Sequence, residues 1–170
     1  AGVSADDFTK YLDIAAQAQR KSNQSMQQLL EANIVAGGSF KMLNIPMNKS
    51  GALLGVLANR GIKGSEAGKA LSSVFANLVT ETGQAGEALD AMGISLFDSN
   101  GKQRDMVDVL KELREKLVNT ADGTSTLTEQ QQAQYAAMLG GKTQFDTLMA
   151  LLDGLGGEYD ELVVNLDNSS

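Results

Sequence analysis

Residues 105–119 read DMVDVLKELREKLVN, and this stretch decides the fold class. Its large apolar side chains recur every three or four residues, which is the spacing that brings side chains onto one face of an α-helix. These side chains are Met106, Val109, Leu110, Leu113 and Leu117. Glu112 and Lys116 lie one helical turn apart and can pair across that turn. The stretch therefore predicts an amphipathic helix with one buried face.

Similar stripes continue outward from it in both directions. Helices are predicted over 5–20, from Ser25 onward, over 48–59, 65–82, 84–92 and 127–139, and from Tyr159 to the polar end. Glycine and proline divide them, so breaks are expected at Pro46 and at Gly140–Gly141, and a kink or a break is expected at Gly37–Gly38. Thr126 and Glu129 are expected to form the capping box of the helix over 127–139.

One stretch departs from helical spacing. Ile94 and Leu96 alternate with polar residues, and Asn100–Gly101 is the pair favoured in a type I′ turn. A small β-hairpin is therefore predicted near 94–104, leaning on a helix because an isolated hairpin is marginal in water. The expected fold is all-α, with several short-to-medium amphipathic helices packed as an irregular bundle beside this hairpin.

Composition narrows the classes of function. The chain of 170 residues has a formal net charge of −7 and no basic run longer than Arg20–Lys21, which argues against sequence-independent binding to nucleic-acid phosphates. It contains no Cys and no His, so disulfides, thiol nucleophiles, ordinary zinc sites and imidazole acid–base chemistry are excluded. No segment approaches the roughly 20 apolar residues of a membrane span. Because the sequence begins with Ala1 and not Met, we expect it to be a segment of a longer chain.

The stretch GIKGSEAGKAL, residues 61–71, is the strongest candidate for a ligand site. Its glycines and Lys69 suggest a phosphate-binding loop, which requires G-x-x-x-x-G-K-[ST] after a strand. Only three residues separate Gly64 from Gly68, and Ala70 stands where the loop needs a hydroxyl. The spacing instead predicts a turn followed by a helix, with Gly68 where another helix crosses closely and Lys69 facing solvent.

The remaining polar motifs do not assemble into a site. The acidic residues of DSNGKQRD, 98–105, do not fall at the alternating ligand positions of a calcium loop. Glu158, Asp160 and Glu161 are expected to face water at a helix start, where negative charge is mildly stabilising. We therefore predict a non-enzymatic protein with no catalytic, cofactor-binding or metal-binding residues. An acid-dependent hydrolase is the weaker alternative.

Four longer stretches carry a resemblance to a known family. They are GVSADDFTKYLDIAAQAQRKSNQSMQQL, GALLGVLANRGIKGSEAGKAL, LDAMGISLFDSNGKQRDMVDVLKELREKL and LGGKTQFDTLMALLDG, in that order. Together they resemble the core region of bacteriophage tail tape measure proteins, or minor tail proteins, over about residues 1–160. Residues 1–155 are accordingly expected to form a tape measure core-like helical domain. Residues 156–170 are expected to begin a further helix and a polar linker into the rest of the parent chain.

The resemblance implies a structural role without catalysis. Tape measure proteins are long, mostly helical chains whose length sets the tail length of long-tailed phages and prophages, and they leave the tail ahead of DNA at infection. The implied partners are the tail tube protein, tail assembly chaperones and distal tail or baseplate proteins, with self-association left open and no specific nucleic-acid binding or membrane span. The implied location is the tail lumen of the virion, after assembly in the bacterial host cytoplasm. The alternative is a soluble bacterial helical scaffold or interaction module unrelated to tails.

Overall fold

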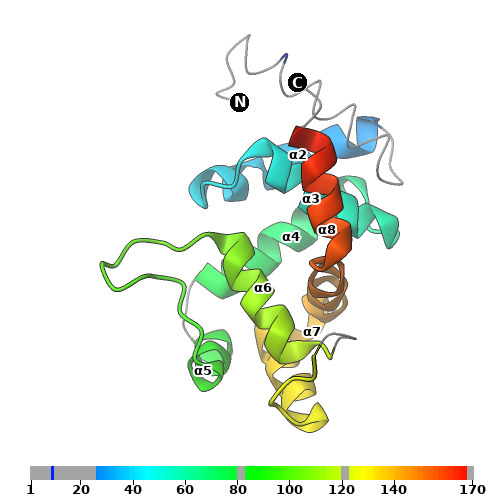
Figure 1. The fold of residues 1–170 in the computed structure, drawn as a ribbon. Coiled ribbons are helices and arrows are strands. Elements are labelled where there is room, and N and C mark those ends of the chain that lie inside the picture. Colours follow the sequence, from blue (N-terminus) through cyan, green and yellow to red (C-terminus); the bar gives the residue numbers. More distant parts are fainter. Residues whose placement is uncertain (1–8, 10–25, 80–82, 120–122, 168–170) are drawn as a thin grey trace. The chain divides into compact units, whose positions relative to one another are not determined.

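The computed structural model describes residue 9 and residues 26–79, 83–119 and 123–167 (Figure 1). Every regular element in these residues is a helix. The helices are α2 (Met26–Met42), α3 (Met47–Asn59), α4 (Gly64–Val79), α5 (Gly83–Met92), α6 (Met106–Leu117), α7 (Glu129–Gly154) and α8 (Gly157–Asp167). The predicted all-α fold class is thus confirmed, and none of these described helices is long and apolar enough to cross a membrane. The helix predicted over 5–20 and the cap predicted at Ser25 fall outside the described residues.

The helices belong to two compact units. The first unit comprises Ala1–Lys69 and Gly156–Ser170, and its described helices are α2, α3, the start of α4, and α8. The second comprises Ala70–Leu155 and contains the rest of α4 with α5, α6 and α7. The separation of a domain over 1–155 from a further helix and linker over 156–170 stays a prediction.

In the first unit, α3 is buried along most of its length. Residues Ser50 to Ala58 are all buried, and this run contains only leucine, valine, alanine, glycine and serine. A helix that is apolar all round needs apolar surroundings on every side, and the rest of the first unit supplies them to α3. α8 packs against it, and the buried side chains of α8 are Tyr159, Leu162 and Leu166.

Polar contacts fix the direction of α8 along α3. Arg60, just after the last turn of α3, forms an ion pair with Glu158 at the start of α8, with 2.5 Å between Nη1 and Oε2. At the other ends of the two helices, Asn48 donates a hydrogen bond to Asp167. The start of α3 therefore lies beside the end of α8, and the two helices are antiparallel.

The sequence predicts a kink or a break in α2 at Gly37–Gly38. A break is wrong, because the helix continues through both glycines to Met42. Ala36 and Phe40 are buried on either side of the pair, and tertiary burial outweighs the weak helix propensity of glycine. The helix ends where Asn44 adopts a φ of 55°, and Pro46 then precedes α3 in an extended conformation. The predicted break between helices at Pro46 is confirmed.

In the second unit, α6 has the buried face that its sequence predicts. Its fully or almost fully buried side chains are Met106, Val107, Val109, Leu110, Leu113 and Leu117. Asp105 caps the helix by accepting a hydrogen bond from the backbone N–H of Val107 at 2.8 Å. Both α6 and α5 pack against α7, which is the longest helix described. The stripe in residues 105–119 thus forms the core of this unit.

The hairpin predicted near 94–104 is wrong, since these residues form no strand and contain only an isolated antiparallel bridge between Phe97 and Gln103. A tight turn does form, with Gly101 at a φ of 78°. Strands do not extend from this turn because the residues on either side of the loop already form hydrogen bonds with the neighbouring helices. On one side the Ile94 N–H closes α5 by donating to the Leu89 carbonyl, and on the other Asp105 caps α6.

α7 contains the predicted break at Gly141, where φ is 67° and ψ is −168°. The capping box at its start is predicted two residues too early. Thr128 accepts from the backbone N–H of Gln131, and the Gln131 side chain accepts from the backbone N–H of Thr128. Ser125 makes the difference, because its hydroxyl accepts from the Leu127 N–H and donates to a carbonyl at the end of α6. That turn delays the helix beyond Thr126.

Candidate interaction surfaces

Acidic side chains do not gather into a metal site in the described part of the chain. No three of its Asp, Glu, His or Cys residues lie close enough to hold an ion. The prediction that the protein has no catalytic, cofactor-binding or metal-binding residues stays a prediction. The described residues instead form close helix contacts, a hydrogen-bonded loop between α5 and α6, and an exposed apolar face on α2.

The glycine stretch over 61–71 forms the turn between α3 and α4. Gly61 and Gly64 have φ values of 84° and 61°, a region that glycine enters without steric strain. The N–H of Gly61 and that of Ile62 close the end of α3 on the Ala58 and Leu57 carbonyls, each at 3.0 Å. The predicted turn followed by a helix is confirmed.

A carboxylate, and not a phosphate, lies beside the start of α4. An ideal Cβ built on Gly64 would be 3.0 Å from Oε2 of Glu31, which comes from α2. The N-terminal end of a helix carries partial positive charge and attracts anions. Because Glu31 already supplies a negative charge there, the geometry disfavours phosphate binding at this turn.

Gly68 is the point where α4 crosses α2. A Cβ at this position would lie 2.7 Å from the Ala32 carbonyl oxygen and 2.7 Å from Cβ of Val35. Real Cβ atoms essentially never approach other atoms this closely, so only glycine allows the two helices to touch here. The prediction that Gly68 permits a close helix crossing is confirmed, and Lys69 is exposed as predicted.

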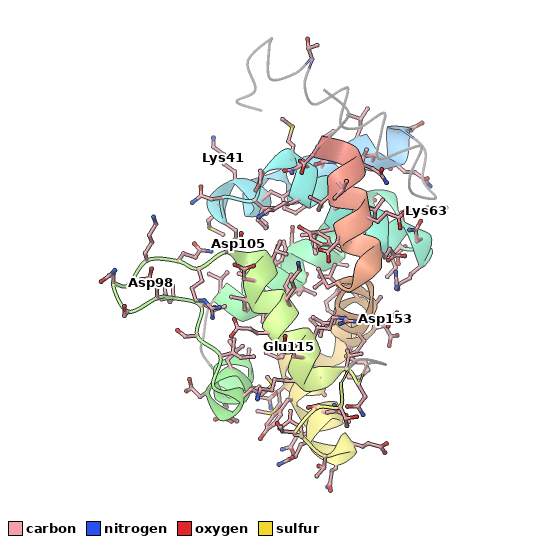
Figure 2. All side chains as sticks on the ribbon, viewed as in Figure 1. Lys41, Lys63, Asp98, Asp105, Glu115 and Asp153 are labelled. Carbon is pink, nitrogen blue, oxygen red and sulfur yellow. The ribbon has the colours of Figure 1, made fainter. Side chains whose placement is uncertain are left out.

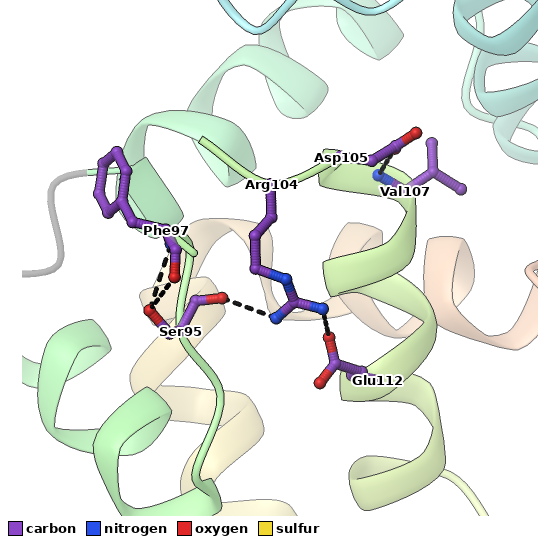
Figure 3. Close-up of polar contacts among 6 residues, drawn as sticks. All are labelled: Ser95, Phe97, Arg104, Asp105, Val107 and Glu112. Carbon is purple, nitrogen blue, oxygen red and sulfur yellow. Dashed lines mark hydrogen bonds and ion pairs between the residues drawn. The ribbon is translucent and has the colours of Figure 1, made fainter. Parts of the chain in front are cut away.

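Polar contacts join the base of the loop between α5 and α6 to itself and to α6 (Figure 3). Arg104 donates to the Ser95 carbonyl at 2.8 Å and pairs through its other terminal nitrogen with Glu112 of α6. Ser95 Oγ both donates to the Phe97 carbonyl and accepts from the Phe97 N–H. Glu112 is thus committed to Arg104, although the sequence suggested Lys116 as its partner.

The tip of the same loop is organised by Asp98, which lies out on the loop away from α6 (Figure 2). Its Oδ1 accepts hydrogen bonds from the backbone N–H groups of Asn100 and Lys102, both at 2.9 Å. These bonds stabilise a turn and leave the calcium-loop hypothesis without support. Phe97 remains 40% exposed on this fixed loop.

The outer face of α2 is apolar and open to solvent. We define it by Ile34, Gly38 and Met42, which are one helical turn apart; Ile34 is 80% exposed and Met42 65% exposed. From the sequence, Gly38 was expected only as part of an interruption of the helix, and Ile34 and Met42 were not singled out. The available signal was their position opposite the buried stripe that includes Leu29 and Phe40.

Comparison with known proteins identifies the family. The model of the family described as phage-related minor tail protein matches residues 1–141. No curated protein and no solved structure matches the chain significantly. Since the match covers most of the sequence, the chain belongs to the phage-related minor tail protein family. This membership disfavours the alternative of a helical scaffold unrelated to tails.

Proposed function

We propose that this member of the phage-related minor tail protein family is a segment of a tape measure protein in the tail of a long-tailed phage or prophage. The family match over residues 1–141 carries the proposal. Tape measure proteins resemble this chain in being mostly helical, and the described residues form helices joined by turns. The role is structural: the side chains make helix contacts, and no chemical step is assigned to them.

Within such a protein this segment is a folded module and not part of the extended measuring length. Arg60 and Glu158 are 98 residues apart in the sequence and yet form an ion pair. As one straight helix the same residues would span about 150 Å, at about 1.5 Å each. Because the chain returns on itself, residues added here do not lengthen the ruler in proportion.

The proposed partners follow from this role. The tail tube protein would polymerise around the parent chain, assisted by tail assembly chaperones, and distal tail or baseplate proteins would contact one of its ends. The proposed location is the tail lumen of the virion, after assembly in the host cytoplasm. Exposed helix faces such as that of α2 would supply the contacts.

Mass spectrometry of purified virions tests the assignment. Peptides from residues 26–167 are expected in tails made by a phage or induced prophage that carries the gene. Their absence from infectious virions would overturn the proposal. So would a parent chain barely longer than 170 residues, since such a chain could not act as a ruler.

Tail length measured by electron microscopy tests the division between module and ruler. An insertion of about 60 helical residues in the extended part of the parent is expected to lengthen the tail by about 90 Å. The same insertion at Asn100–Gly101, in the exposed loop between α5 and α6, is expected to leave tail length nearly unchanged. Equal lengthening by both insertions would contradict the module.

A further inference from the structure

Asn100 lies at the tip of the loop between α5 and α6, and nothing in the described part of the chain holds its side-chain amide. Asn100 and the following Gly101 are both exposed. The backbone N–H of Asn100 donates to Asp98, but its side-chain amide forms no hydrogen bond with a described residue. The amide is therefore free to turn toward the backbone of the residue that follows it.

The other described asparagines are placed differently. Each of them is followed by a residue with a side chain, whereas Asn100 is followed by glycine, which has no Cβ to obstruct its backbone nitrogen. Several of them also use their side-chain amides in hydrogen bonds; these are Asn33, Asn48, Asn59, Asn77 and Asn119. Among the described asparagines, Asn100 alone combines exposure, an unbonded amide and a following glycine.

We propose that Asn100 is a site of spontaneous deamidation, with water as the only co-reactant. The backbone nitrogen of Gly101 loses its proton and attacks Cγ of Asn100. The new C–N bond closes a cyclic imide, the Cγ–Nδ2 bond breaks, and Nδ2 leaves as ammonia. Water then opens the imide. Attack at Cγ gives aspartate, and attack at the backbone carbonyl gives isoaspartate, in which the main chain runs through Cβ and Cγ. Overall, an amide and one water become a carboxyl group and ammonia.

The folded turn sets the rate of this reaction. The N–H of Gly101 donates to the Asp98 carbonyl at 3.0 Å, which engages the attacking nitrogen. Oδ1 of Asp98, at the loop tip in Figure 2, accepts from the N–H groups of Asn100 and Lys102, both at 2.9 Å. These bonds lie in an exposed loop, where local opening costs little free energy compared with the unfolding of a core. Deamidation therefore proceeds from the opened turn, and Asp98 restrains it.

Deamidation changes the loop that carries the exposed Phe97. Aspartate at position 100 adds a negative charge two residues from Asp98, and like charges at short range repel. Isoaspartate also adds a main-chain atom inside the turn, which is closed by a bond of 2.8 Å from the Asp98 N–H to the Lys102 carbonyl. That donor and acceptor then no longer match, so the turn loosens beside the Phe97 ring. The inference rests on this loop alone, so its failure would leave the proposed tail role intact.

Peptide mapping of the folded chain, after incubation in mildly alkaline buffer, tests the site. Trypsin cuts after Lys69 and Lys102 and releases one peptide that contains both Asn77 and Asn100. Asn77 is the internal control, because its Nδ2 donates a hydrogen bond at 3.4 Å and a leucine follows it. We expect fragmentation mass spectrometry to show conversion of Asn100 at least about tenfold faster than conversion of Asn77. Equal rates, or an Asn100 that stays intact, would overturn the proposal.

Two variants test the chemistry and the restraint by Asp98. Asn100→Gln lengthens the side chain by one methylene and is expected to abolish conversion at this position, since the larger ring forms far more slowly. Asp98→Ala removes the carboxylate that accepts from both backbone N–H groups, and is expected to raise the conversion rate of Asn100 at least about threefold in the folded chain. In an isolated peptide of residues 70–102, which has no folded turn to lose, the same change is expected to alter the rate less than about twofold. The same acceleration in both, or none in the folded chain, would refute control by the turn.

Discussion

Gly68→Ala tests the closest helix contact in the first unit, where α4 crosses α2. The added Cβ would lie 2.7 Å from the Ala32 carbonyl oxygen and 2.7 Å from Cβ of Val35. The carbonyl belongs to the backbone of α2 and cannot rotate aside as the end of a flexible side chain can. The two helices must therefore move apart, and the packing of Ala67 and Leu71 on either side of the contact loosens.

The size of the effect follows from two opposing contributions. Forcing extra volume into a packed contact typically costs about 1–3 kcal/mol. Alanine in place of a helix-interior glycine returns about 0.5–1 kcal/mol through propensity and chain entropy. Because the clash is with backbone, the first contribution dominates, and we expect Gly68→Ala to lower the free energy of unfolding by about 1–2 kcal/mol.

Urea denaturation followed by circular dichroism measures this change, with Gly38→Ala as the matched control. Gly38 is also inside a helix, but an added Cβ there meets nothing within 4 Å. The control is therefore expected to raise the free energy of unfolding by about 0.5–1 kcal/mol. Opposite signs at the two sites are the expected result. Equal stabilisation by both substitutions would show that α4 and α2 do not cross closely at Gly68.

Three further substitutions test the second unit by the same denaturation assay. Leu113→Ala, at a fully buried position of α6, is expected to cost about 2–5 kcal/mol; a loss below about 0.5 kcal/mol would mean that this face is not core. Gly141→Ala forces a φ of 67° with a ψ of −168° on a residue with a side chain and is expected to cost about 1–3 kcal/mol, whereas the control Gly157→Ala, at an unstrained and open site of the first unit, is expected to be nearly neutral. Asp105→Ala removes the cap of α6 and is expected to cost about 0.5–2 kcal/mol, with Asp105→Asn retaining most of the stability; equal losses in both variants would argue against capping.

The sequence predicts those helices and turns whose conformation depends on side-chain spacing or on a single glycine. The stripe from Met106 to Leu117 lies on one face at any helical geometry, so its burial in α6 follows from spacing alone. The turn at Gly61 and Gly64 and the break at Gly141 are predictable for a similar reason, because each needs a positive φ that glycine supplies. These features depend on the residue itself and on its near neighbours.

The errors arise where distant contacts or competing caps decide the outcome. Gly37–Gly38 is a weak helix segment in isolation, and it stays helical because Ala36 and Phe40 are buried. The turn at Asn100–Gly101 has the chemistry of a hairpin, but beyond the bond from the Arg104 N–H to the Leu96 carbonyl the flanking residues Ile94 and Asp105 are hydrogen-bonded to α5 and α6. A local sequence pattern does not show which distant segment buries a helix face. It also does not show which neighbouring group accepts a given backbone hydrogen bond.

The candidate surfaces divide in the same way. The sequence predicted that Gly68 lies at a helix crossing. It did not predict that α2 is the crossing helix, because nothing in the sequence of residues 31–36 distinguishes them from other helical segments. The outer face of α2 was missed because a single Ile and a single Met at helical spacing are common in helices. Their significance appears only once the opposite side of the same helix is known to be the buried one.

The pairing of α3 with α8 limits how the proposed module can behave in a tail tube. Tyr159, Leu162 and Leu166 are all buried, and exposing such side chains costs about 1.5–3 kcal/mol each, or roughly 5–9 kcal/mol together as an upper bound. Extending the chain would also break the Arg60–Glu158 pair and expose the continuous apolar surface of α3. A module threaded through the tube in extended form would therefore need contacts with the tube wall, or with other copies, of comparable strength. Without them, we expect the module to remain folded and the proposed measuring length to lie elsewhere in the parent chain.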